Sequence, residues 1–177
     1  MPPIHRYTSA KPWSQTRPKT LVVACSDGRL QKGIDEFLEQ HMGVVDYDRL
    51  YTPGGPGALA ASGYELLRAD QFRREFAFLM QAHGTEEVIL IFHGAAEGGP
   101  EHATCAHYKR LMPNAPRAEI ARQQERDAEE VLRQAFIGLA KVRVHVYRAE
   151  VAADNSVRFM DLLLPGMDKG PGIEIGF

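Results

Sequence analysis

The chain has only two cysteines among its 177 residues, Cys25 and Cys105. Small secreted folds that depend on disulfides are much richer in cysteine, so that class is not indicated. No apolar run approaches the roughly 20 residues that a membrane-spanning helix needs. The formal net charge of -2 provides no strong attraction to nucleic acid or to an anionic membrane surface. The first residues also lack the apolar segment of a signal peptide, so we expect a cytoplasmic protein that binds neither nucleic acid nor membranes.

Apolar runs alternate with amphipathic segments along most of the chain. Short runs rich in β-branched residues predict strands, whereas apolar residues spaced three and four apart predict helices. The predicted strands lie at 21–24, 48–52, 87–92, 142–151 and 157–163, and the predicted helices at 32–42, 58–82, 102–111 and 116–139. This alternation indicates an α/β fold of three layers, in which helices flank a mostly parallel central sheet. The last two strands are expected to form an antiparallel hairpin at its edge.

The ends of the chain differ in composition from the middle. Residues 1–19 contain four prolines and no apolar core of their own, which predicts an N-terminal arm that is either disordered or packed on a partner subunit. Residues 20–177 are long enough for a single domain with a sizeable core. From residue 165 onwards proline and glycine are frequent, so an irregular tail is expected.

The first reactive side chains follow the apolar run at 21–24, in the sequence Cys25-Ser26-Asp27-Gly28-Arg29. Open α/β sheets carry their chemistry at the carboxyl ends of the strands, which is where this segment is expected to lie. The thiol can be a nucleophile, a metal ligand or half of a disulfide with Cys105. Arg29 follows Cys25 by only four positions, which is too short for the anion-binding loop of a thiol phosphatase.

The second cysteine stands in the sequence His102-Ala103-Thr104-Cys105. On a helical turn, residues three apart point the same way. Together with Cys25 this pair makes a set of two thiols and one imidazole, which in catalytic zinc sites leaves the fourth position open. Buried apolar cysteines and a nucleophilic Cys–His pair are the alternatives. His93 is a second candidate for the histidine because it directly follows the strand at 87–92, but it has no cysteine three residues later, so His102 is favoured.

These two motifs resemble those of the β-class carbonic anhydrase family. Three elements carry the resemblance: a Cys-x-Asp-x-Arg motif, a His-x-x-Cys motif and a glycine-rich turn after the second strand. In this chain they are matched by Cys25, Asp27 and Arg29, by His102 and Cys105, and by Pro53-Gly54-Gly55.

The resemblance implies a zinc enzyme that hydrates CO2 reversibly to bicarbonate, usually as a homodimer or a higher oligomer. Zn2+ would be held by Cys25, His102 and Cys105, and its hydroxide would attack the substrate. Asp27 and Arg29 would form the catalytic pair. Gly54 and Gly55 would bind substrate by allowing the backbone to approach it closely.

The chain departs from the family pattern around the second motif. The family usually has glycine before the histidine and after the cysteine, where this chain has Glu101 and Ala106, and residues 93–101 intervene between the strand and His102. Two alternatives therefore stay open. One is a zinc hydrolase of the same fold that acts on a CO2 analogue, carbonyl sulfide or carbon disulfide. The other is a non-catalytic zinc-binding interaction or sensing protein in which Asp27 or a further histidine fills the fourth position.

Overall fold

The structure, a computed structural model, describes residues 5–61, 66–162, 164 and 172–175. Strands and helices alternate over most of this length. In chain order the elements are β1 (Thr20–Cys25), α1 (Gln31–Gln40), β2 (Asp48–Thr52), η1 (Gly55–Leu59), α2 (Leu66–His83), β3 (Glu87–Ala95), η2 (Glu101–Ala103), α3 (Ala106–Leu111), α4 (Arg117–Gln134), β4 (Val142–Val151), β5 (Val157–Asp161) and β6 (Ile173–Ile175).

The strands form one sheet in the order β2-β1-β3-β4-β5. The first four strands of the chain pair in parallel, and β5 returns antiparallel beside β4. The mostly parallel sheet and the antiparallel edge hairpin are therefore confirmed. The tail contributes a strand that was not expected, since β6 pairs antiparallel with the beginning of β4.

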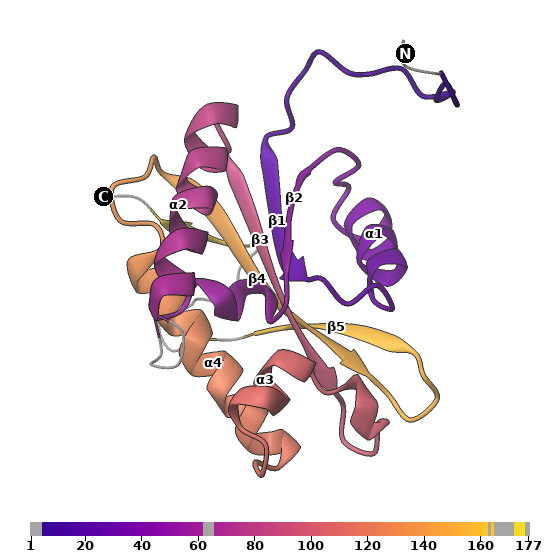
Figure 1. Ribbon diagram of the computed structural model, residues 1–177, viewed down its shortest axis with the longest axis vertical. Coiled ribbons are helices and arrows are strands. Elements are labelled where there is room, and N and C mark those ends of the chain that lie inside the picture. Colours follow the sequence, from indigo (N-terminus) through magenta and orange to yellow (C-terminus); the bar gives the residue numbers. More distant parts are fainter. Residues whose placement is uncertain (1–4, 62–65, 163, 165–171, 176–177) are drawn as a thin grey trace.

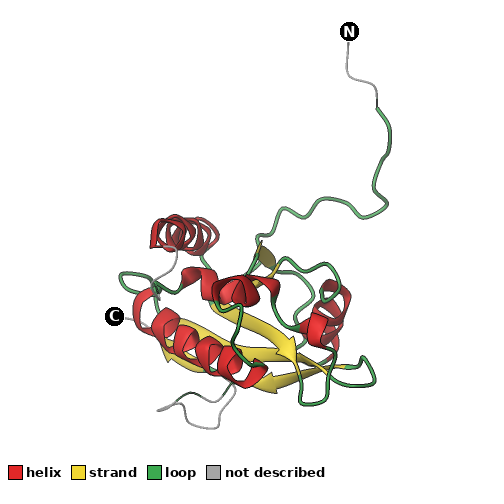
Figure 2. Cartoon of the chain, turned by 60° about the horizontal axis from the view of Figure 1, so that its bottom comes forward, coloured by secondary structure: helices red, strands yellow, loops and turns green. Residues whose placement is uncertain are grey.

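Helices cover both faces of the sheet, which gives the three predicted layers (Figures 1 and 2). One face packs against α2 and α4 through a large apolar cluster that includes Phe76, Val131 and Phe136. The other face packs against α1 through Ile34 and Leu38. Every residue of β1 is buried, as expected for a central strand covered on both sides. None of the described helices is both long and apolar enough to cross a membrane.

Two of the predicted helices are interrupted, and strand β3 is clearly longer than predicted. The helix expected over 58–82 is the 3-10 turn η1 followed by α2, with residues 62–65 outside the described part. The helix expected over 102–111 is η2 followed by α3, because the backbone is extended at Thr104 and Cys105, with ψ of 133° and 118°. Strand β3 continues three residues beyond Phe92, where its pairing with β4 persists through Ala95. Described residues of the N-terminal arm lead away from the sheet and helices (Figure 1).

Candidate metal centre

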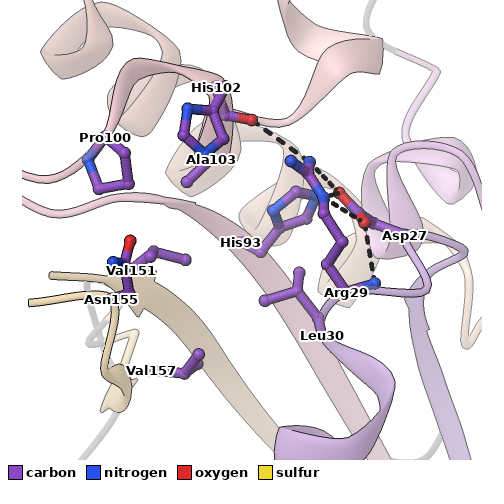
Figure 3. A pocket seen from close by; sticks show the side chains of 10 residues that line it. All are labelled: Asp27, Arg29, Leu30, His93, Pro100, His102, Ala103, Val151, Asn155 and Val157. Atoms are coloured by element: carbon purple, nitrogen blue, oxygen red, sulfur yellow. Dashed lines mark hydrogen bonds and ion pairs between the residues drawn. The ribbon is translucent and has the colours of Figure 1, made fainter.

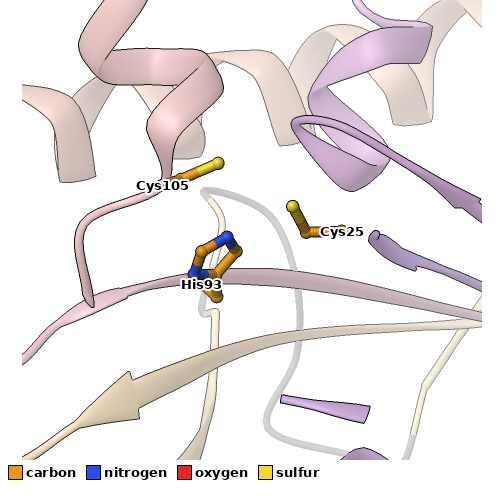
Figure 4. Close-up of side chains that lie close together, drawn as sticks. All are labelled: Cys25, His93 and Cys105. Atoms are coloured by element: carbon orange, nitrogen blue, oxygen red, sulfur yellow. The ribbon is translucent and has the colours of Figure 1, made fainter. Parts of the chain in front are cut away.

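Three side chains that can bind a metal meet at the carboxyl end of the sheet (Figure 4). Cys25 is the last residue of β1, His93 lies near the end of β3, and Cys105 directly precedes α3. Their potential ligand atoms, two thiol sulfurs and an imidazole nitrogen, all lie within 4.8 Å of one another. All three residues are buried, with exposed fractions of 7, 3 and 1%. No other such group occurs in the described parts of the chain.

The lengths of the strands explain why His93 belongs to this group. The last registered pair between β1 and β3 is Ala24 with Ile91. Cys25 then ends β1, whereas β3 continues beside β4 and carries His93 two residues beyond that pair. The imidazole therefore stands at the point where the neighbouring strand stops.

The loop that follows β3 returns the chain to the same place. Its backbone is fixed to β4 by a hydrogen bond from the Ala96 amide to the Val151 carbonyl, 3.0 Å long. Arg117, the first residue of α4, donates from Nη1 to the carbonyl of Gly99 at 2.6 Å. Glu101 makes an ion pair with Lys109 of α3. These contacts hold the loop at both ends and bring Cys105 over the end of β1.

His102, the histidine favoured from sequence, does not join the two thiols. The expectation of one helix over 102–111 is wrong, so the three-residue spacing to Cys105 does not place the two side chains on one helical face. The His102 residue is exposed, and its carbonyl accepts a hydrogen bond from Arg29 Nη2 at 3.3 Å. The structure thus brings His93 to the cysteines in its place.

The environment of His93 fits a bound metal ion. Both ring nitrogens are buried, and neither has a hydrogen-bond partner among the described residues. A buried polar atom without a partner is costly, and a role as a metal ligand is one physical reason for it. Two thiols and one imidazole are ligands that Zn2+ prefers. The three residues present therefore fit a zinc ion.

The two thiols influence one another strongly. The hydrogen bond from Cys105, assisted by the nearby His93 imidazole, lowers the pKa of the Cys25 thiol to about 4 although burial raises it. The same interaction, together with burial, raises the pKa of Cys105 well above its ordinary value. In this pair Cys25 gives up its proton more readily than Cys105, and Cys105 must lose its proton when it binds a metal.

Asp27 and Arg29 form a two-pronged ion pair beside this group. Arg29 Nε donates to Asp27 Oδ1 at 2.9 Å and Nη2 donates to Oδ2 at 2.5 Å. The hydrogen bonds from Arg29 lower the pKa of the Asp27 carboxyl to about 2. The Asp27 side chain is 20% exposed and that of Arg29 is 60% exposed. The carboxylate is therefore ionised at neutral pH and has a fixed direction.

A pocket of about 160 Å³ opens beside these residues (Figure 3). Its wall combines polar and apolar side chains, and the β4–β5 hairpin contributes to it. The lining residues are Asp27, Arg29, Leu30, His93, Pro100, His102, Ala103, Val151, Asn155 and Val157. His93 is the one residue that belongs both to this lining and to the three-residue group.

Gly54 and Gly55 are absent from the lining of this pocket. Both have a positive φ, of 91° and 57°, which favours glycine. A Cβ at Gly55 would lie 2.8 Å from the backbone nitrogen of Cys25, and one at Gly54 would lie 2.5 Å from the His107 ring. In this structure the two glycines let the turn pack closely against β1 and α3, and their role in substrate binding stays a prediction.

The pocket contains residues that the sequence motifs did not indicate. Val151, Asn155 and Val157 come from the β4–β5 hairpin, and nothing in their local sequence marks them as part of a site. His93 had a signal, since it directly follows an apolar strand.

No protein-family model matches the sequence, and no curated protein matches it. Among solved structures it is similar to a β-carbonic anhydrase from Trichomonas vaginalis, with 12% identity over 86% of this chain and 88% of that chain and a TM-score of 0.43. It is also similar to a β-carbonic anhydrase of Aspergillus fumigatus, with 14% identity over 85% and 78% of the chains and a TM-score of 0.44. The apo form of a carbon disulfide hydrolase covers 81% of this chain and 78% of its own at 13% identity, with a TM-score of 0.38.

Proposed function

We propose that the protein is a zinc-dependent lyase that hydrates CO2 reversibly to bicarbonate. One observation carries this proposal: a buried Cys25–His93–Cys105 group with an unpartnered imidazole borders a pocket that also holds an ionised carboxylate. Zinc sites that catalyse reactions use three protein ligands and keep one position open. When zinc is bound, it lowers the pKa of a water molecule toward about 7 and so supplies a nucleophile at neutral pH.

Asp27 is proposed to orient the attacking water. Its ionised carboxylate faces the pocket and can accept a hydrogen bond from water beside His93. Arg29 occupies both carboxylate oxygens, which holds Asp27 in this direction. Asp27 is also not a member of the close group of potential ligands. Both facts favour an open fourth position over a closed, non-catalytic site.

The apolar side chains of the pocket wall fit a small substrate without charge. Leu30, Val151 and Val157 belong to this wall, together with Asp27 and His93. This wall supports CO2 as the substrate, and it also favours the second candidate, a hydrolase of carbonyl sulfide or carbon disulfide, because both are apolar analogues of CO2. Rates measured side by side on the three substrates decide between the two functions.

The first experiment measures zinc content and CO2 hydration of the purified protein. We expect about one zinc per chain and hydration that is lost, together with the zinc, in Cys105→Ser. Serine keeps the size of the side chain but replaces the thiolate that zinc prefers. Folded wild-type protein that takes up no zinc from a buffered zinc solution would overturn the proposal. Zinc-loaded protein that turns over carbon disulfide or carbonyl sulfide much faster than CO2 would replace it by the second candidate.

We also expect the protein to be a homodimer or a larger homo-oligomer. The strand β2 lies at an open edge of the sheet, and the neighbouring helix α2 exposes Leu67 and Phe78 with fractions of 89 and 67%. In the arm, Trp13 is 84% exposed. Exposed large apolar side chains on one helix indicate an interaction surface, and an exposed tryptophan in the arm is available for contact with a partner subunit. Light scattering of the native protein should give a particle mass of at least twice the chain mass. Removal of residues 1–19 should lower this particle mass. A wild-type protein that is monomeric at micromolar concentration would contradict the expectation.

A further inference from the structure

Helix α4 carries two polar side chains on its buried face. That face also contains Ile120, Ala128 and Val131, yet Gln124 and Asp127 are only 1 and 3% exposed. Polar groups in such a position destabilise the fold unless they find hydrogen-bond partners. Gln124 and Asp127 both have hydrogen-bond partners. Each partner belongs to a segment that carries a residue of the Cys25–His93–Cys105 group.

Gln124 contacts the segment that carries the imidazole. Its Nε2 donates to the main-chain carbonyl of His93 at 2.9 Å. No residue of β1 is registered with β3 beyond Ile91, so this carbonyl lies where the neighbouring strand has ended. The Gln124 Oε1 atom is buried without a partner among the described residues, so an apolar side chain would suit the fold itself better. We therefore attribute the presence of a glutamine at this buried position to its contact with β3.

Asp127 lies about one turn further along α4 and contacts the segment that carries Cys105. The Tyr108 hydroxyl donates to Asp127 Oδ2 at 2.6 Å, and Gln123 Nε2 donates to Oδ1 at 2.7 Å. Tyr108 lies in the first turn of α3, three residues after Cys105, and is 1% exposed. Its ring packs in one cluster with both cysteines and Ile120.

A glycine in the 3-10 turn η1 makes room for this contact. A Cβ at Gly57 would lie 2.0 Å from the Tyr108 hydroxyl oxygen. The hydroxyl therefore occupies the space that a larger residue would fill at that position. The buried hydrogen bond between α3 and α4 depends on the absence of a side chain in the turn after β2.

We propose that Gln124 and Asp127 are positioning residues, which hold candidate metal ligands in place without binding the metal themselves. Gln124 holds His93 through its carbonyl, and Asp127 holds Cys105 through Tyr108, so one helix fixes two of the three candidate ligands. The inference rests on the proposed function for the presence of zinc at this group. Partners that orient metal ligands in this way typically contribute 10–100-fold to metal affinity or activity.

The test uses two variants that remove one hydrogen bond each and keep the packing. Tyr108→Phe loses only the hydroxyl, and Gln124→Met has a similar shape without the amide. We expect each to weaken zinc binding by about 10–100-fold in competition with a chromophoric chelator. In the Co2+-loaded protein we expect the sulfur-to-cobalt absorption band to shift or broaden. Circular dichroism verifies that both variants keep the fold.

Val131→Ala is the matched control on the same helix. Val131 is fully buried in the core cluster between the sheet and α4, and it is not part of the cluster that contains the cysteines. Its truncation loosens α4 without removing either hydrogen bond to a ligand segment, so zinc affinity and the cobalt spectrum should stay at the wild-type values. Unchanged affinity and spectrum in both Tyr108→Phe and Gln124→Met overturn the inference, and so does an equal loss in Val131→Ala.

The wild-type measurements separate this inference from the proposed function. If wild-type protein binds zinc and the variants differ in zinc affinity as expected, but wild type does not hydrate CO2, the positioning role is supported and the proposed activity is overturned. Wild-type protein that hydrates CO2 while all variants bind zinc equally overturns only the positioning role. A folded wild type that binds neither zinc nor cobalt overturns both.

Discussion

Replacement of His93 by alanine should abolish zinc binding and CO2 hydration together, whereas replacement of His102 should leave zinc binding intact. His93 is buried within 4.8 Å of both thiols and its ring nitrogens have no other described partner, so its removal leaves only two ligands. The loss should exceed the about 100-fold that follows when an outer partner of a ligand is removed. His102 contacts Arg29 through its carbonyl, which alanine retains.

Thermal unfolding with and without zinc measures this difference independently of activity. A metal that binds only the folded protein at 100 times its dissociation constant stabilises it by about 2.7 kcal/mol. We expect the midpoint of unfolding to rise with zinc for wild type and for His102→Ala, but not for His93→Ala. Without zinc, His93→Ala should lose little stability through hydrogen bonding, because the imidazole makes no described hydrogen bond. If His102→Ala loses the response and His93→Ala keeps it, the ligand is His102.

The contrast between the two histidines shows where local sequence patterns stop being informative. The strands and their order follow from apolar runs such as 21–24 and 87–92, because a buried parallel strand needs such residues regardless of its neighbours. The His102–Cys105 spacing is meaningful only on a helix, and the chain is extended at Thr104 and Cys105. The place of His93 depends on β3 extending past the end of β1, which is decided by pairing with β4 some 50 residues later.

The Cys25-Ser26-Asp27-Gly28-Arg29 segment was more predictable because its chemistry is local. The end of the preceding strand fixes Cys25, and the Asp27–Arg29 pair forms between residues two apart. The pocket above it was not predictable, since Val151 and Val157 arrive from a distant hairpin. Local pairs can thus be inferred from sequence, whereas the walls of a site need the tertiary structure.

Asp27→Asn should lower the rate of CO2 hydration by about 100-fold and leave the zinc content at the wild-type value. Asparagine keeps the shape of the side chain but removes the negative charge that orients water, and a misplacement of reacting groups by about 1 Å can cost about 100-fold. Asp27 does not belong to the close ligand group, so zinc should stay bound. Stopped-flow hydration with a pH indicator measures the rate, and metal analysis measures the zinc. Parallel loss of zinc and activity would instead identify Asp27 as a ligand.

Arg29→Gln tests the same pair from the other side. Without the guanidinium, the pKa of Asp27 should rise from about 2 toward its ordinary value of about 3.9. A carboxyl whose pKa is lower in the folded than in the unfolded protein stabilises the fold when the pH is above its pKa in the unfolded chain. This contribution is lost as the pH falls through its pKa in the folded protein. Because Arg29 is largely exposed, solvent screening limits the loss at pH 7 to about 1 kcal/mol. Denaturant unfolding at pH 7 should therefore give a lower free energy of unfolding for Arg29→Gln than for wild type, and this difference should largely disappear at pH 2. A difference that persists at pH 2 would mean that Arg29 stabilises the fold by packing rather than through the charge of Asp27.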